Sequence, residues 1–204
     1  MKADFRGSKT DHTHTEYFSY LLAIYHIPPE FLAIENNLIN GHMSFNCSID
    51  PNEPNCSNNA TMSHLTFETG KTHLLRLINA GGAGNQKFSR DERDLVVIAN
   101  DFVPAQPYTT KVVTLGEGQR SDILVRATGR SNDAVWMRAE LDVLCLNVMS
   151  MQPNATAPIY YSEADTSRLP SSSGAIWELN NCANVSILQS HFVYTHESTN
   201  MCHD

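Results

Sequence analysis

The sequence has no long apolar run and few basic residues. No stretch approaches the roughly 18 consecutive apolar residues that a transmembrane helix needs. The 14 Lys and Arg residues are outnumbered by 22 Asp and Glu, which gives a net charge of -8. The basic residues are also scattered, whereas neutralising a phosphate backbone takes clustered cations. We therefore expect neither a membrane nor a nucleic acid as a partner.

Common catalytic and metal-binding motifs are also missing. The chain has no HExxH, GxSxG, P-loop or GxGxxG motif, and no CxxC pair that would indicate zinc. Gly116-Glu117-Gly118 lacks the third glycine and the following helix of a dinucleotide site. The motifs therefore indicate no self-contained catalytic site. With 41% hydrophobic and 18% charged residues, the composition is that of an ordinary globular protein.

Sites for N-linked glycosylation are numerous. Such sequons mark exposed loops in secreted proteins, and three of them fall within residues 46–61. The five candidates are Asn46, Asn55, Asn59, Asn154 and Asn184. Residues 1–6 nevertheless lack the apolar core of a signal peptide. We interpret the chain as a fragment of a longer secreted precursor.

Five cysteines leave at least one without a partner if disulfides form. Cys47 and Cys56 bracket a polar, Pro- and Asn-rich loop that a disulfide can close. Cys145 and Cys182 are the next pair, and Cys202 is left over. Free buried thiols are the alternative. Together with the sequons, the pattern favours an oxidising compartment and two disulfides.

The middle of the chain consists of short segments rich in β-branched and aliphatic residues. We predict strands at residues 72–78, 95–99, 111–115, 123–127 and 135–141, with turns at 79–84, 100–101, 104–107, 116–118 and 129–133. No helical period with caps interrupts them. The spacing predicts an all-β sandwich or barrel. We expect Trp136 in the core, with Arg138 and Glu140 facing outward.

Two histidine patterns allow a copper site or a surface segment. His12 and His14 would project from one face of a strand, as in copper-ligand pairs, or they lie in a surface turn. His203 follows Cys202, as in a His-Cys-His copper segment, but the residue before Cys202 is Met201 and not histidine. A terminal tail is therefore the favoured interpretation.

Seven motifs in order resemble the second domain of fungal laccases, which are multicopper oxidases. They span residues 10–185: TDHTHTEYF at 10–18, NLING at 37–41, GKTHLLRLINAGGAG at 70–84, VIANDFVPAQPY at 97–108, GEGQRSD at 116–122, AVWMR at 134–138 and LNNCAN at 179–184. The resemblance implies a cupredoxin-like (plastocyanin-like) Greek-key β-sandwich or barrel with irregular terminal tails. It also assigns residues 1–10 to a divergent N-terminal segment, 11–163 to domain two, and 164–204 to a linker and a truncated start of a third-domain region.

In the full-length family, the resemblance implies a secreted oxidoreductase that oxidises phenol-type molecules and reduces dioxygen to water. The copper ligands come from the flanking cupredoxin domains, which would be this chain's partners. Copper is therefore the cofactor of the full-length family, and none is expected bound to this chain alone. His14 matches a histidine of the domain boundary, which argues against copper there.

Domain two of the resembled family contributes scaffold and one wall of the reducing-substrate pocket. The wall would be the turn formed by Ala80, Gly81, Gly82 and Ala83. Ala83 stands where many relatives carry an acidic proton acceptor, so a purely structural turn is the alternative. The motif residues Gly118, Gln119, Arg120 and Asp122 are expected to hold a loop through charge-assisted hydrogen bonds. Cys145 and Cys182 stand where some relatives have a disulfide, and we expect residues 166–174 to loop out between them.

Three hypotheses follow. The chain is a domain-two portion of a laccase-like oxidase, inactive alone. Alternatively, it is a non-catalytic secreted glycoprotein that uses the sandwich as a binding or interaction module. The third hypothesis is a metal-binding protein that uses His12 and His14.

Overall fold

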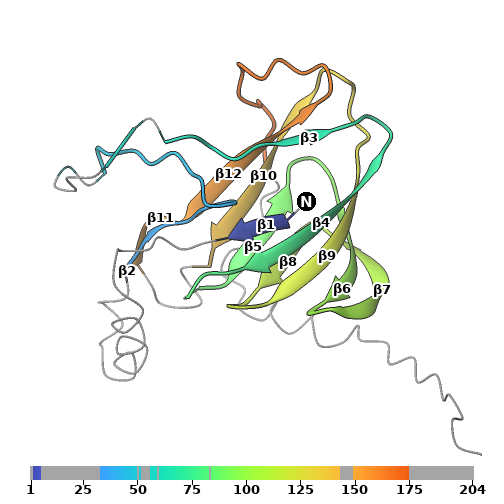
Figure 1. Cartoon of the computed structure of the whole chain (residues 1–204), viewed down its shortest axis with the longest axis horizontal. Coiled ribbons are helices and arrows are strands. Elements are labelled where there is room, and N and C mark those ends of the chain that lie inside the picture. Colours follow the sequence, from blue (N-terminus) through green and yellow to red (C-terminus); the bar gives the residue numbers. More distant parts are fainter. Residues whose placement is uncertain are drawn as a thin grey trace, which may run out of the picture.

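The computed structural model describes residues 2–5, 33–49, 51, 56–58, 60–82, 84–142 and 149–174. Strands and no helices occur within these ranges, in two five-stranded sheets and a two-stranded one (Figure 1). The all-β, cupredoxin-like prediction is confirmed. The N-terminal tail was expected to be irregular, but residues 2–5 form a strand that pairs in parallel with residues 76–79. Residues 6–32, with His12 and His14, and the C-terminal tail from 175 to 204 lie outside the described residues.

The first sheet has the order β1-β4-β9-β6-β7 and the second β3-β12-β10-β5-β8. The bounds of the first are β1 (Lys2–Phe5), β4 (Thr72–Asn79), β9 (Arg120–Arg126), β6 (Leu95–Asn100) and β7 (Val103–Thr110). Those of the second are β3 (Leu65–Phe67), β12 (Asn154–Tyr161), β10 (Ala134–Leu141), β5 (Gln86–Arg90) and β8 (Val112–Leu115). A parallel pair, β2 (Ala33–Asn36) and β11 (Met149–Gln152), forms the third sheet.

The chain crosses between the two large sheets at almost every connection from β4 to β10. Strands β9 and β10 alternate buried and half-buried residues, as expected when one face of a strand meets a core. The buried cluster draws on both sheets and includes Leu77, Phe88, Ile123, Met137 and Ile159. Burying each such side chain contributes about 1.5–3 kcal/mol, so this cluster fixes where the strand ends and their turns lie.

The turn predicted at residues 104–107 is wrong, because these residues belong to β7. Pro104 and Pro107 cannot donate to a strand ladder, but β7 is the last strand of its sheet. An edge strand tolerates proline because one side makes no ladder hydrogen bonds. A register shift between Val97 and Ala99 of β6 accompanies this edge.

The core position expected for Trp136 is also wrong. Side chains alternate along a strand, so Trp136 shares the half-buried outer face of β10 with Arg138 and Glu140. Residues 166–174, expected to loop out, lie against this face instead. The Trp136 indole Nε1 donates to the Pro170 carbonyl (2.9 Å), and its backbone N–H donates to Ser172 Oγ (3.1 Å).

The polar loop after β2 is closed by a disulfide between Cys47 and Cys56, whose Cα atoms are 5.7 Å apart. Cys145 and Cys182 lie outside the described residues, so their pairing stays a prediction.

Candidate functional site

The turn after β4 is organised by the side chain of Asn79, which is completely buried. Its Nδ2 donates to the carbonyls of Gly84 (2.9 Å) and Leu115 (3.1 Å), and its Oδ1 accepts from the Gly81 N–H (3.1 Å). Both amide donors and the acceptor are therefore used, as burial of a polar side chain requires. The amide joins the 80–84 turn to the end of β8.

Backbone hydrogen bonds tie the same residue to the turn between β8 and β9. The Asn79 N–H donates to the Gln119 carbonyl (3.0 Å), and the Asn79 carbonyl accepts from the Gly118 N–H (2.9 Å). Gly118 has φ of +76°, in the left-handed region that glycine enters without a steric penalty. Gln119 closes the turn, since its Oε1 accepts from the Gly116 N–H at 2.7 Å. The β4–β5 and β8–β9 turns, each of which connects the two sheets, thus form one hydrogen-bonded unit.

An acidic side chain reaches the 80–84 turn from the β8–β9 turn. The Glu117 carboxylate Oε1 accepts a hydrogen bond from the Gly84 N–H. Ala80 and Gly82 are exposed and Gly81 is half-buried, and all three are small. Ala83 lies outside the described residues. The arrangement presents a surface of small residues beside one anchored carboxylate. That carboxylate belongs to the 116–122 motif, which the sequence analysis did not connect with this turn.

Arg120 and Asp122 take different partners on this end of the sandwich. The Arg120 N–H donates to Asp101 Oδ1 (2.8 Å) and its Nη1 donates to the Gly118 carbonyl (2.7 Å). Its guanidinium also lies 5.3 Å from the centre of the Phe102 ring, which is 82% exposed. Asp122 faces Arg76, with 3.7 Å between Oδ2 and Nε. These contacts hold the 116–119 turn against the β6–β7 turn.

Charged pairs hold the second sheet at two points that the sequence did not indicate. Arg138 Nε and Nη2 donate to the two carboxylate oxygens of Asp91 at 2.7 and 2.9 Å, and Ser172 Oγ donates to the same carboxylate at 2.8 Å. The hydrogen bonds to Asp91 raise the pKa of Arg138. Lys87 Nζ lies 2.9 Å from Asp142 Oδ2, and both side chains are buried. Each pair is a structural ion pair with its charge compensated.

The described histidines do not gather into a copper site. His73 stacks on Phe67, with ring centres 4.0 Å apart, and its Nε2 accepts from the Glu68 N–H. His42 Nδ1 lies 3.4 Å from Thr61 Oγ1. No group of three or more His, Cys, Asp or Glu within the described ranges is close enough to hold a metal ion. Copper sites of oxidases use several imidazole and thiolate donors together, and these residues do not fit such a site.

Two of the five glycosylation candidates can be placed. Asn46 and Asn154 are both exposed, the latter as the first residue of β12. Asn55, Asn59 and Asn184 lie outside the described residues. A search of the described part of the chain for a helix long and apolar enough to cross a membrane finds none.

Known proteins are similar to this chain in sequence and in fold. The family model "Multicopper oxidase" matches residues 9–164. Oxidoreductase OpS5 of Beauveria bassiana is 39% identical over 134 residues, covering 61% of this chain and 22% of that protein. Laccase-2 of Botryotinia fuckeliana is 38% identical over 134 residues, with 66% and 22% covered.

The solved laccase of Botrytis aclada superposes with a TM-score of 0.72 at 32% identity, over 87% of this chain and 31% of that one. The solved multicopper oxidase Fet3p shares the fold at 18% identity, with a TM-score of 0.63. The chain thus spans 22% of the length of the first two relatives. From its motifs, its two-sheet cupredoxin architecture and these matches, the chain belongs to the multicopper oxidase family.

Proposed function

We propose that this chain supplies the middle cupredoxin domain of a laccase-like oxidase, as scaffold and as one wall of the reducing-substrate pocket. Residues 11–163 form that domain, and 164–204 lead toward a third. The flanking domains hold the copper and carry out phenol oxidation coupled to reduction of dioxygen. The observation that carries the proposal is the Asn79 unit, which fixes a small-residue turn at one end of the sandwich.

The wall would act through shape and one carboxylate. Ala80, Gly81 and Gly82 leave space for a substrate ring because they project almost no side chain. Glu117 supplies the carboxylate that Ala83 cannot. One of its oxygens is held by the Gly84 N–H, and the other retains lone pairs for a phenol proton.

The compartment proposed for the parent protein is extracellular. A disulfide between Cys47 and Cys56 supports an oxidising environment. The exposed positions of Asn46 and Asn154 are compatible with glycan attachment. Intact-mass measurement of protein secreted from a fungal host, before and after glycosidase treatment, tests both glycan sites through Asn46→Gln and Asn154→Gln variants.

A chimera tests the domain-two role. Residues 9–164 would replace the matching segment of the Botrytis aclada laccase, and copper per chain and oxygen uptake on a phenol would be measured. We expect full copper loading and turnover with a changed KM, because the parent's flanking domains stay in place and the pocket wall is exchanged. In the chimera, Glu117→Gln should lower kcat/KM by about a hundredfold, as loss of a positioned proton acceptor does, and should remove one limb of the pH profile.

Glu68→Gln is the matched control, since Glu68 is an exposed acid on another turn. A chimera that loads copper but oxidises phenols with the KM of the parent laccase would contradict the wall role. Equal kcat/KM for the Glu117→Gln and Glu68→Gln chimeras would contradict the role given to Glu117.

A further inference from the structure

Arg90, the last residue of β5, is buried without an acidic partner. The residue is 4% exposed, and its guanidinium contacts are neutral. Nη2 donates to Tyr161 Oη at 2.9 Å, Nη1 donates to the Arg126 carbonyl at 3.4 Å, and the ring of Phe67 lies 5.6 Å away. Nε has no hydrogen-bond partner among the described residues. A buried cation with no counter-charge is costly.

The electrostatic surroundings of Arg90 add to this cost. Burial is the largest influence and lowers the pKa of Arg90, and the nearby charge of Arg93 lowers it further. The Tyr161 hydroxyl and, to a smaller extent, the Glu92 carboxylate oppose both effects. The charged state is thus destabilised at a position where no carboxylate of the described chain forms an ion pair with Arg90.

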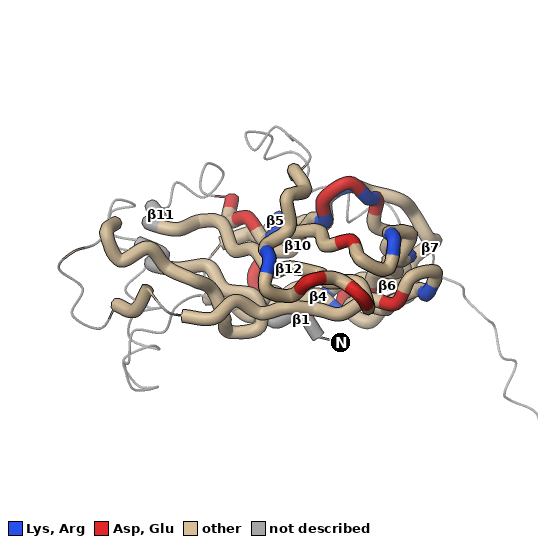
Figure 2. Tube along the Cα trace, turned by 90° about the horizontal axis from the view of Figure 1, so that it is seen from above, with Lys and Arg blue, Asp and Glu red and all other residues tan. Residues whose placement is uncertain are grey.

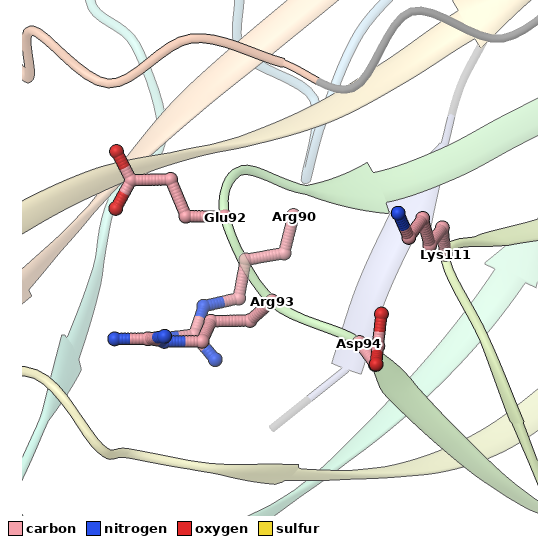
Figure 3. Close-up of a pocket in the computed structure, with 5 residues that line it drawn as sticks. All are labelled: Arg90, Glu92, Arg93, Asp94 and Lys111. Atoms are coloured by element: carbon pink, nitrogen blue, oxygen red, sulfur yellow. The ribbon is translucent and has the colours of Figure 1, made fainter.

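A cavity of about 280 Å³ lies beside Arg90, lined by Arg90, Glu92, Arg93, Asp94 and Lys111. Figure 3 shows the Arg90 and Arg93 side chains extending in the same direction from the β5–β6 turn, while the Glu92 carboxylate points another way. Lys111 and Asp94 lie on the other side of the view, Lys111 coming from the β7–β8 connection. Neither Arg93 nor Lys111 belongs to an ion pair within the described ranges.

We propose that this cavity binds a small anion through its carboxylate or phosphate group, recognised by Arg90 and Arg93, with Lys111 adding positive charge from the opposite side of the cavity. Guanidinium groups match such oxygens in geometry and form strong charge-assisted hydrogen bonds with them. A bound anion would supply the negative charge that the buried Arg90 guanidinium lacks. The three cations exceed the two acids, Glu92 and Asp94, by one charge, which suits a monoanion.

The size and place of the cavity define the ligand further. Its volume is several times the roughly 30 Å³ that one water occupies in the liquid, so it admits a small organic body attached to the anionic group. It lies at the Arg90 end of β5, whereas the Asn79 unit lies at the Gln86 end. The anion site is therefore independent of the proposed substrate wall.

Calorimetric titration and thermal unfolding of the full chain test the site, with inorganic phosphate and benzoate as probes against chloride at equal ionic strength. We expect saturable binding and a rise in Tm with at least one probe, because a ligand that binds only the folded state stabilises it. Benzoate alone would identify an organic carboxylate as the ligand class, and phosphate alone a phosphate group. Binding of both would identify a general oxyanion site.

Arg93→Gln should weaken binding by about tenfold, as loss of one charge-assisted contact does. Lys111→Gln should weaken it less, because the ammonium acts on the anion from a longer distance. Arg130→Gln removes an equally exposed arginine on another turn and should leave binding unchanged. Both cavity variants change exposed side chains, so they should fold. The absence of saturable binding to either probe would overturn the proposal, as would binding that responds equally to all three variants.

Discussion

The two ends of β5 differ in how their polar groups are satisfied. At the Gln86 end, the buried amide of Asn79 uses all of its hydrogen-bonding groups within two turns. At the other end, Arg90 is buried with neutral contacts and a free Nε. Its chain neighbour Asp91 points to the outer face and pairs fully with Arg138. The polar groups with complete hydrogen bonding stabilise the fold. The buried Arg90 cation instead indicates a binding place for an anion that the chain itself does not supply.

The distribution of charge follows the same contrast. Figure 2 shows Lys, Arg, Asp and Glu concentrated over the part of the sandwich that contains β5, β6 and β10, while the stretch around β11 is almost free of them. The Asn79 unit works through amides and backbone groups, with Glu117 as its acidic member. The proposed substrate wall and the proposed anion site therefore differ in chemistry: the first uses amides and backbone groups, and the second uses charged side chains.

The largest expected effect is at Asn79. Asn79→Ala leaves the Gly84 and Leu115 carbonyls without their buried donor, and should lower the free energy of unfolding by about 3 kcal/mol. Urea denaturation measures it, with Asn85→Ala on the adjoining loop as the comparison. If Asn79→Ala cost less than about 1 kcal/mol, the turn would not depend on this amide.

The next effect tests the paired cation. Asp91→Asn removes the charge that holds Arg138 and should destabilise the chain by about 2 kcal/mol, below the usual range for buried pairs because the Arg138 side chain is 23% exposed. Asp94→Asn, an exposed acid three residues on, should stay within about 0.5 kcal/mol. If urea denaturation gave the two variants equal free energies of unfolding, the ion pair between Asp91 and Arg138 would not stabilise the fold.

A smaller effect is expected at Gly118. No atom lies within 4 Å of a Cβ added there, so Gly118→Ala meets only the strain of a positive φ, and about 1 kcal/mol should be lost. Gly118→Asn should lose less, because asparagine enters the left-handed region more readily. Thermal unfolding of both variants gives the order, and a more stable alanine variant would contradict the assigned turn geometry.

The smallest change in stability is expected at Arg90. Arg90→Met replaces a buried unpaired cation with an apolar chain of similar length, and such replacements are often neutral or stabilising. We expect a change within about 1 kcal/mol by urea denaturation, together with loss of anion binding. A loss as large as that of Asp91→Asn would show that Arg90 is structural and fully compensated in the folded chain.

The strand pattern could be predicted where one face of a strand meets the core. Strands β4, β9 and β10 alternate along their length, and the sequence predicted all three. Strand β5 could not be predicted, because its polar sequence QKFSR is buried throughout. Its partners come from far along the chain: Asn37 for Gln86 across 49 positions, and Tyr161 for Arg90 across 71.

Two errors have simple physical reasons. Pro104 and Pro107 indicate a turn unless the strand lies at a sheet edge, and edge position is a property of the whole topology. Trp136 was predictable, since its spacing of two from Arg138 places both on one face. At the candidate site, the 80–84 turn was predicted from its motif, but the Glu117 contact depends on the β4–β5 and β8–β9 turns meeting in space.

The central claim is that this chain is a scaffold domain whose copper chemistry lies elsewhere in a larger enzyme. Elemental analysis of copper per purified chain, with oxygen uptake on a phenol, tests it most directly. The account predicts near-zero copper and no phenol-dependent uptake for the chain alone. Stoichiometric copper with turnover would contradict it. His12, His14 and the residues around Cys202 would then be the candidate copper ligands.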